Sequence, residues 1–342
     1  MDIGDEVSEL CLRDREGNIL ERTRVKTREV ELSRWFGKQE QLRVVLEAGT
    51  HSPWISRLLT RTGHDAVVLQ PRRVALIAKS LEKTDRIDAE LLSFLGNFPD
   101  NQLHRVRHRS MEAQVDLELL RARAAAVRAR TGLINHARGV TKAIGERLPR
   151  CDADTFHHKA APAVPAALRT ALEPLLVTIG GLTEAIKGYD AAIERLCRER
   201  YPVTGILRQV DSIGPLTALT FVLTLEDPGR FRRSRQVGRY LGLTPGQRQS
   251  GKRRRALGIT KEGDEDVRWL LVQCAQRILG PLGRDCTLRK WGLEHITAGN
   301  ALSKRKTVVA VARKLAVLLH HLWHTGESYE PFYGQQEVQP AA

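Results

Sequence analysis

Residues 42–71 read LRVVLEAGTHSPWISRLLTRTGHDAVVLQP, and this stretch decides the fold class of the first part of the chain. LRVVLEAG, residues 42–49, is rich in branched apolar residues and ends at a glycine, which is typical of a strand. PWISRLLTRTG, residues 53–63, begins at a proline and stops at a glycine, as helices often do. DAVVLQP, residues 65–71, again has the pattern of a strand. The stretch therefore predicts strand, helix and strand in succession.

The residues on either side extend this pattern. VSELCLRD, residues 7–14, and GNILERTRV, residues 17–25, are expected to be two strands joined at Gly17-Asn18, a hairpin signal. Residues 29–38 are expected to be a short helix, and helical stretches continue through residue 96. The order of these elements predicts an α/β sheet with helices packed on it.

Two long helical segments follow, at residues 110–147 and 165–200. Their apolar residues recur at alternating spacings of three and four, the pattern of a coiled coil. These positions are Leu117, Leu120, Ala124, Val127, Thr131 and Ile134, and then Leu168, Leu172, Leu175, Ile179, Leu182, Ile186, Tyr189, Ile193 and Leu196. We expect an antiparallel hairpin or a dimeric coiled coil, with a globular helical bundle as the alternative.

The surroundings of these two helices are also predicted. The Pro- and Ala-rich residues 149–165 between them are expected to be a loop, and Pro174 and Gly180-Gly181 could kink the second helix. Five arginines lie off the apolar stripe, where they would form a solvated face or touch nucleic-acid backbone: Arg121, Arg123, Arg128, Arg130 and Arg138.

The third region starts at residue 201. VDSIGPLTALTFVLTL, residues 210–225, resembles a helix-hairpin-helix, whose backbone amides can hold a phosphate. Residues 228–261 carry eleven Lys or Arg and no Asp or Glu, and two helical stretches follow, at 264–279 and 304–326. Three domains are therefore expected, at residues 1–105, 106–200 and 201–335.

Composition narrows the class of protein. The 342 residues are 42% hydrophobic and 28% charged, as in a folded soluble protein. No membrane span or secretory signal is recognisable, and the five scattered cysteines fit a reducing cytoplasm. The net charge of +15 favours a polyanionic partner such as nucleic acid, although a basic protein can also simply be soluble.

Four carboxylates are candidates for metal-dependent chemistry on phosphodiesters. Asp2 lies at the start of the chain, Glu47 ends a strand, and Asp85 and Asp88 are three residues apart, on one face of a helix. Such chemistry needs several carboxylates converging on divalent ions, and hard oxygen ligands suit Mg²⁺. Taken singly, each residue is more often a solvated or capping carboxylate.

Six separated segments together resemble one family, the DEDD transposases of bacterial insertion sequences, often called the insertion sequence one-ten family. Three lie near the start (MDIGDEVSELCLRDREGNIL, VVLEAGTHSPWI and KTDRIDAELL), and the remainder include DSIGPLTALTFVLTLEDPGRFRRSRQVGRYLGLTPGQRQSG and VAVARKLAVLLHHLWHTGESYEPF. The resemblance implies a ribonuclease H-like N-terminal domain similar to the RuvC resolvase. Only Met1 precedes the first aspartate, so a clipped first strand or a late start is expected.

The resemblance also implies roles for particular residues. The four acidic residues of the family fall on Asp2, Glu47, Asp85 and Asp88, which would hold Mg²⁺, and its serine falls on Ser250. Ser250 would attack a DNA phosphodiester and form a phosphoserine link. The basic residues around it would draw in the scissile phosphate and stabilise its charge: Arg248, Lys252, Arg253, Arg254 and Arg255. Alternatively, Ser250 belongs to a basic loop that only grips phosphate.

The sequence therefore predicts a site-specific DNA recombinase that mobilises an insertion sequence. The family resemblance implies a structured guide RNA encoded by the element, and a homo-oligomer in which two protomers complete one site. The basic surfaces would then hold RNA as well as donor and target DNA. Two alternatives remain open: a resolvase-like nuclease that uses water, and an inactive nucleic-acid-binding relic of a transposase.

Overall fold

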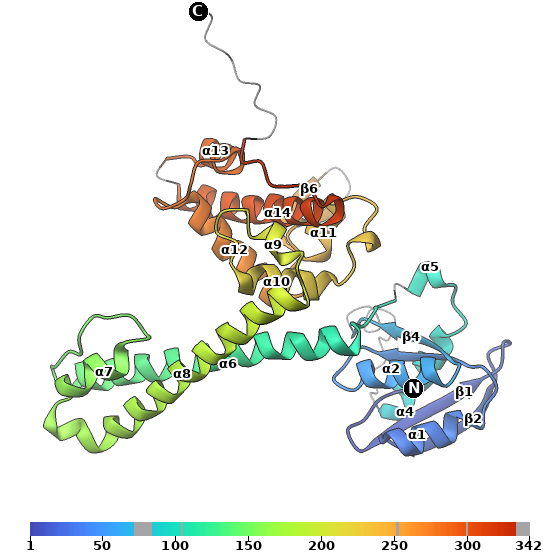
Figure 1. Ribbon diagram of the computed structural model, residues 1–342. Coiled ribbons are helices and arrows are strands. Elements are labelled where there is room, and N and C mark those ends of the chain that lie inside the picture. Colours follow the sequence, from blue (N-terminus) through green and yellow to red (C-terminus); the bar gives the residue numbers. More distant parts are fainter. Residues whose placement is uncertain (72–83, 104, 251–252, 299, 333–342) are drawn as a thin grey trace, which may run out of the picture. The chain divides into compact units, whose positions relative to one another are not determined.

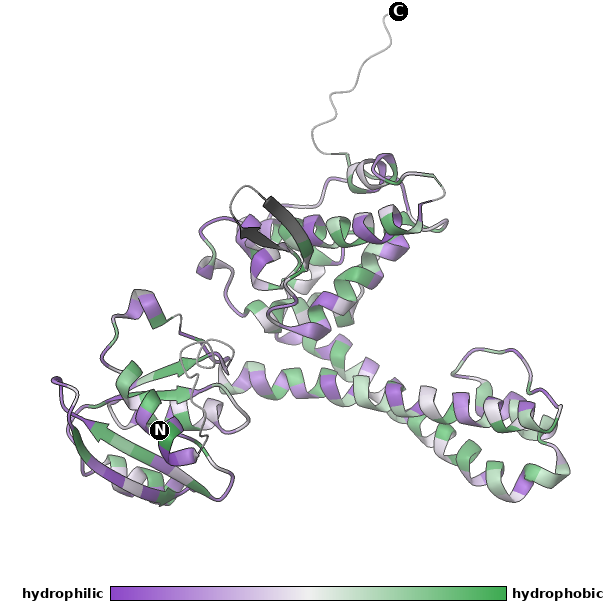
Figure 2. Ribbon diagram, turned by 180° about the vertical axis from the view of Figure 1, so that it is seen from behind, coloured by the Kyte–Doolittle hydropathy of each residue, from purple (hydrophilic) through white to green (hydrophobic). Residues whose placement is uncertain are grey.

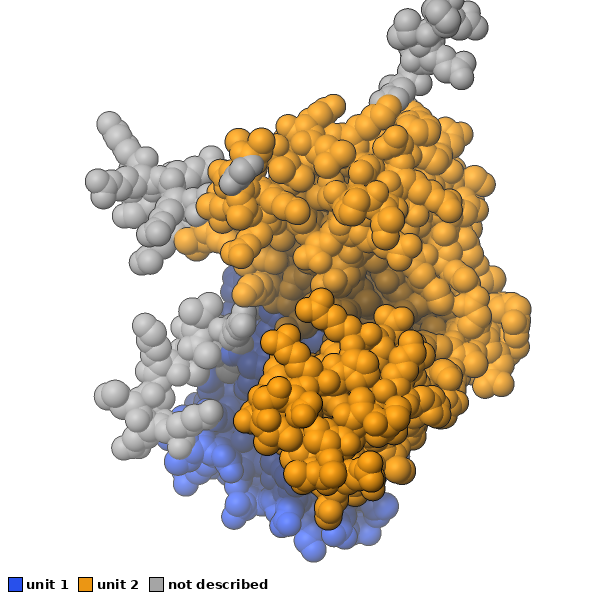
Figure 3. Space-filling model, turned by 90° about the vertical axis from the view of Figure 1, so that its left-hand side faces the viewer, with its two compact units in different colours: residues 1–110 blue, residues 111–342 orange. Residues whose placement is uncertain are grey.

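A computed structural model describes the chain except for residues 72–83, 104, 251–252, 299 and 333–342 (Figure 1). It divides into two compact units, Met1–Ser110 and Met111–Ala342, coloured separately in Figure 3. The two units are described one at a time below. The division into three domains stays a prediction.

The first unit starts with the expected hairpin. Strands β1 (Val7–Arg13) and β2 (Ile19–Lys26) pair antiparallel, with Val7 opposite Lys26. Gly17 in the connecting turn has a φ of 93°, which glycine adopts without steric strain. Strands β3 (Arg43–Glu47) and β4 (Asp65–Leu69) pair parallel. Helix α2 (Ser52–Arg61) makes this possible, because it returns the chain to the end at which β3 begins.

The first two residues are bonded to both pairs of strands. Asp2 and Glu9 exchange backbone hydrogen bonds of 2.9 and 3.0 Å, which attaches them to β1. The N-terminal amino group of Met1 donates to the carbonyl of Val45 in β3, at 2.9 Å. Residues 1–2 thus link the hairpin to the parallel pair, and they place Asp2 beside β3.

Helices cover both faces of the β3–β4 pair, because successive residues of a strand point to opposite sides. Val44 and Leu46 pack in one core with helix α1 (Glu29–Phe36) and α2, while Val45 packs in another with helix α4 (Asp85–Leu95). A one-turn helix, α5 (Asp100–Leu103), follows α4. The expected α/β class is confirmed for this unit, and its arrangement as a RuvC-like sheet stays a prediction.

The second unit begins with two long helices, α6 (Met111–Ala143) and α8 (Arg169–Glu199), which pack against each other within one chain (Figure 1). Arg123 bonds Asp190 and Arg130 bonds Thr183, so the numbering runs in opposite directions and the pair is antiparallel. Apolar clusters hold both ends, one around Leu117 and Ile193 and one around Ile134 and Ile179. Polar and apolar residues alternate along both helices (Figure 2).

The middle of this helical hairpin differs from the predicted stripe. Arg130, expected in solvent, is buried, and Thr131 beside it is exposed. On α8 the buried residues are Leu176 and Thr183 rather than the neighbouring Leu175 and Leu182, which are half-buried. The buried row of α8 still repeats every seven residues, at Leu172, Ile179 and Ile186. The difference is therefore which neighbouring residue flanks that row. A supercoiled coiled coil stays a prediction.

The segment between the two long helices is not the loop that its composition predicts. It contains helix α7 (Phe156–Ala160) and two 3₁₀ turns, η1 (Ala161–Ala163) and η2 (Ala166–Leu168). Phe156 is fully buried against α8, and this one aromatic residue anchors a segment that is otherwise rich in proline and alanine.

The rest of the unit is mainly helical. Its elements are α9 (Thr204–Leu207), α10 (Pro215–Leu225), η3 (Pro228–Arg230), α11 (Arg235–Tyr240), β5 (Pro245–Ser250), β6 (Arg253–Ile259), α12 (Glu265–Leu279), α13 (Thr287–Glu294) and α14 (Ala301–Thr325). Helix α10 is buried from Thr217 to Leu225, and α12 and α14 pack around it. The helix-hairpin-helix expected over residues 210–225 is wrong in its first half, because only Pro215–Leu225 of that stretch is helical and residues 210–214 form a turn. The one-turn helix α9 lies before the stretch. In the described ranges, no helix is both long and apolar enough to cross a bilayer.

Candidate active site

The four predicted carboxylates lie in the first unit, at neighbouring ends of its elements. Asp2 is half-buried beside β1, and Glu47 is the last residue of β3. Asp85 and Asp88 occupy the first turn of α4, where Thr84 caps the helix by accepting from the backbone N–H of Ile87 at 3.3 Å. A helix N-terminus stabilises negative charge in its first turn.

The charges of these carboxylates act on one another. The pKa of Asp2 is raised above its ordinary value, first by burial and then by the negative charges of Asp85, Asp88 and Glu47, while the amino terminus opposes the shift. Burial also lowers the pKa of the Met1 amino group to about 6. Asp2 is therefore close enough to the other three carboxylates to be repelled by them.

Helix α4 is held where it can bring its carboxylates to Asp2. The Nε of Arg13 in β1 donates to the hydroxyl of Ser93 at 2.8 Å, and Arg22 in β2 pairs with Glu90 at 2.7 Å. Leu92 and Leu95 anchor the other side of the helix against β3 and β4. The hairpin and the parallel strands thus both fix the position of α4.

The four carboxylates do not form a metal-binding cluster in this structure. Within the described part of the chain, no three His, Cys, Asp or Glu side chains are grouped closely enough to hold a metal ion. Asp85 is exposed and Asp88 is half-buried. The four-carboxylate site therefore stays a prediction, supported by the mutual repulsion at Asp2.

The predicted nucleophile belongs to the second unit. Ser250 is the last residue of β5, and it pairs with Arg253 at the start of β6. The same register sets Arg248 opposite Arg255 and Gln249 opposite Arg254. Ser250 therefore ends a strand of a two-stranded hairpin. Lys252 lies outside the described residues.

Comparisons with known proteins account for both parts of the chain. Residues 1–145 match a model described as a transposase, the DEDD type of the IS110 group, and residues 204–284 match the model "Transposase IS116/IS110/IS902 family". The chain belongs to this family of transposases. It is therefore a DNA transposase, an enzyme of DNA recombination.

Curated relatives agree over nearly the whole length. The transposase for insertion sequence element IS1111A of Coxiella burnetii is 27% identical over 96% of this chain and 90% of its own. The transposase for element IS1328 of Yersinia enterocolitica is 27% identical over 92% and 93%. A probable family 20 transposase of Pseudomonas aeruginosa is 28% identical over 97% and 98%.

The DEDD domain implies a ribonuclease H-like fold and a divalent metal ion, typically Mg²⁺. The residues present fit such an ion, because all four side chains offer hard carboxylate oxygens. The repulsion that raises the pKa of Asp2 is the kind of destabilisation that a divalent cation relieves.

Sequence reasoning missed a polar group beside Glu47 in this transposase. His51 bonds Asp5 through Nε2 at 3.0 Å, and its Nδ1 accepts from the indole N–H of Trp54 at 3.0 Å. His108 bonds the hydroxyl of Ser52 at 2.9 Å. The signal was present in AGTHSPW, where a strand end meets a helix start, but Asp5 and His108 come from distant parts of the chain.

Proposed function

We propose that this transposase is a Mg²⁺-dependent, site-specific recombinase that mobilises an insertion sequence through a covalent Ser250–DNA link. The observation that carries the proposal is the electrostatic convergence of Asp85, Asp88 and Glu47 on Asp2. Charges that repel one another at the ends of well-anchored elements favour a site built for a cation rather than for stability.

Asp2, Glu47, Asp85 and Asp88 would hold the metal in this proposal. A divalent ion there would neutralise charge on the phosphate and make a hydroxyl more acidic. The side chains keep their oxygens at strand and helix ends, where α4 is pinned by Arg13 and Leu92.

Ser250 would supply the nucleophile. Its hydroxyl oxygen bonds to the scissile phosphorus as the bond to one deoxyribose oxygen breaks, and the hydroxyl proton ends on that leaving oxygen. The phosphoserine link keeps the phosphodiester bond energy for religation. Arg248, Lys252, Arg253, Arg254 and Arg255 would hold the phosphate, since the β5–β6 register gives Ser250 arginine neighbours on both strands.

The partners belong to the same proposal. Donor and target DNA would be paired by a structured RNA encoded by the element, and the enzyme would act as a homo-oligomer that holds two duplexes. The net charge of +15 supports binding of both nucleic acids by their backbones.

Trapping of a covalent adduct tests the proposal. Wild type with Mg²⁺ should give a protein–DNA adduct that survives denaturation. Ser250→Ala should bind DNA with similar affinity but give neither adduct nor strand exchange, because one hydroxyl is lost and no charge. Should Ser250→Ala recombine DNA at the wild-type rate, the serine mechanism is wrong and a water-using nuclease replaces it.

A further inference from the structure

A groove of about 1300 Å³ runs along α14 in the second unit. One face of α14 lines it at positions that repeat every three to four residues, while the opposite face, with Val311, Leu315 and Leu319, is buried in the core. Leu257 and Ile259 of β6 and Trp291 of α13 also line the groove. Helix α14 thus has one apolar face in the core and a second face that lines the groove.

The floor of the groove is apolar and only half-buried. Val309, Ala310, Val317 and Leu318 lie along it, each partly accessible. The volume exceeds that of most small-molecule pockets, which are about 300–1,000 Å³. An apolar floor left partly open over several helical turns indicates a long ligand rather than a compact one.

Cations follow the floor on the same helix face. Arg305, Lys306, Arg313 and Lys314 line the groove, and Glu330 is the acidic residue among its lining. Among the described residues, none of these four cations has a carboxylate within ion-pair distance. By contrast, Arg123 and Arg130 of α6 are both paired. The groove therefore keeps its positive charge available for an anionic ligand.

Two of the cations are positioned by their neighbours. The stem of Arg313 crosses Gly238 of α11 so closely that a β-carbon there would lie 2.9 Å from its Cγ. The ammonium of Lys314 lies 4.3 Å from the ring centroid of Trp291. Both side chains thus have a preferred place at the groove.

We infer that this groove binds a single nucleic-acid strand, with its bases over the apolar floor and its phosphates on the α14 cations. The inference rests on the proposed function and assigns a role to α13 and α14, which lie outside both ranges that match the family models. Single strands expose apolar base faces together with phosphates, the two features that this groove complements.

The spacing of the cations agrees with such a strand. Eight residues separate Arg305 from Arg313, which is about 12 Å along a helix at 1.5 Å per residue. At a rise of about 3.4 Å per nucleotide, this distance spans three to four stacked nucleotides. A duplex would present phosphates and sugars to the rim, and it would leave the apolar floor unfilled.

The experiment compares two triple variants of the full chain. The groove variant is Arg305→Gln, Arg313→Gln and Lys314→Gln, and the control is Lys304→Gln, Arg277→Gln and Arg284→Gln, three exposed cations that do not line the groove. Fluorescence anisotropy measures binding of a labelled 12-nucleotide single strand and of the matching duplex over a range of salt concentrations. The single variant Arg305→Gln repeats the test with one exposed residue, and thermal denaturation confirms folding.

The groove variant should bind the single strand roughly tenfold or more weakly, and its salt slope should fall by about 2, at about 0.7 per phosphate. The control should keep most of its affinity for the single strand. If the groove variant binds it as tightly as the control does, the inference is overturned and an acidic helix of a protein becomes the better occupant. Equal losses for the duplex and the single strand overturn the single-strand assignment.

These results are distinguishable from failure of the proposed function. If the groove variant keeps its affinity for the single strand and wild type still forms the Ser250 adduct, the groove inference is wrong and the proposed recombinase function stands. A wild type that binds neither oligonucleotide overturns both.

Discussion

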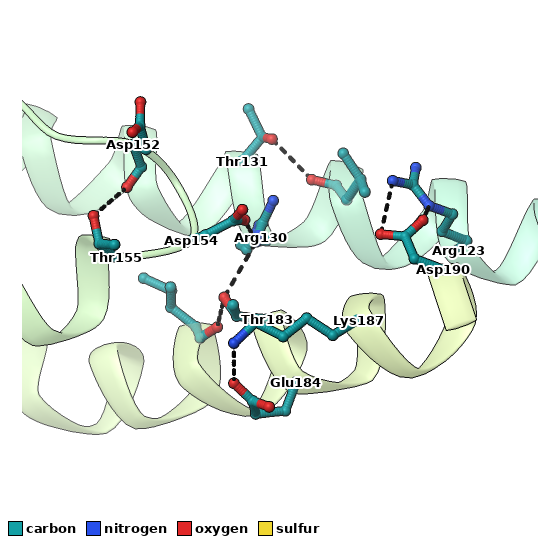
Figure 4. Close-up of polar contacts among 12 residues, drawn as sticks. Arg123, Arg130, Thr131, Asp152, Asp154, Thr155, Thr183, Glu184, Lys187 and Asp190 are labelled. Atoms are coloured by element: carbon teal, nitrogen blue, oxygen red, sulfur yellow. Dashed lines mark hydrogen bonds and ion pairs between the residues drawn. The ribbon is translucent and has the colours of Figure 1, made fainter. Parts of the chain in front are cut away.

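Two charged regions of the transposase are organised in opposite ways. In the helical hairpin, buried charge is compensated: Arg130 bonds Asp154 at 2.5 Å and Thr183 at 3.2 Å (Figure 4). In the first unit, by contrast, three carboxylates repel Asp2, and the amino terminus opposes them in part. A compensated buried charge is costly when its partner is removed, whereas charges of one sign held together are costly until a ligand neutralises them. The difference separates structural from functional charge in one chain.

The largest expected effect comes from removing one uncompensated charge. Asp85→Asn should lower the rate of strand exchange by at least about 100-fold, as is typical when a group that stabilises transition-state charge is lost. It should change the melting temperature little, because the repulsion on Asp2 decreases while the favourable interaction of Asp85 with the N-terminus of α4 is lost. Recombination assays and thermal denaturation measure the two effects. A variant with wild-type activity would show that Asp85 is no ligand.

Substitutions at the Arg130–Asp154 pair of the helical hairpin should change the unfolding free energy rather than the activity. Asp154→Ala leaves the buried Arg130 without its carboxylate, and we expect a loss of about 1–2 kcal/mol, moderated because Asp154 itself is 65% exposed. Arg130→Met should be neutral or stabilising, since an apolar side chain of similar length fills the space and removes the unpaired Nε. Urea denaturation measures both. A larger loss for Arg130→Met than for Asp154→Ala contradicts this view.

The buried His320 gives a third test, because its hydrogen bonds are satisfied but burial disfavours its charged form. His320 bonds the hydroxyl of Ser234 and donates to the carbonyl of Pro228, each at 3.0 Å, and burial lowers its pKa below the ordinary value. The unfolded chain therefore binds more protons near pH 6, and stability should fall as pH drops below about 6.5, by at most about 1.4 kcal/mol per unit. His320→Gln should flatten this dependence in urea titrations from pH 5 to 7, whereas the exposed His324→Gln should not.

The smallest effect should come from an exposed pair of the same hairpin. Arg123 bonds Asp190 at 2.5 Å, but these side chains are 21% and 50% exposed. Arg123→Ala should therefore lower the unfolding free energy by about 0.5 kcal/mol, less than Asp154→Ala, and the loss should shrink in high salt. A loss above that of Asp154→Ala would mean that solvent screens this pair less than its exposure indicates.

Much of the candidate site could be predicted as a set of residues, but little of its arrangement. The motifs pointed to Asp2, Glu47, Asp85 and Asp88, whereas the repulsion among them appears only when residues 1–2 bond to both β1 and β3. Ser250 was expected in a loop or at a catalytic position, and the structure shows it ending a strand. The groove along α14 joins residues from 235 to 331, so no local pattern could reveal it.

The sequence by itself determined the order and type of most elements, because caps, glycines and apolar periodicity act over a few residues. It also determined the family, through six motifs in order, and the strong positive charge. Only the tertiary structure decided which side of the apolar row on the long helices is buried, since Leu175 and Leu176 both flank that row and Arg130 bonds Asp154, 24 residues away. Likewise it decided which charges are left unpaired, because pairing depends on partners that the chain brings together only when it folds.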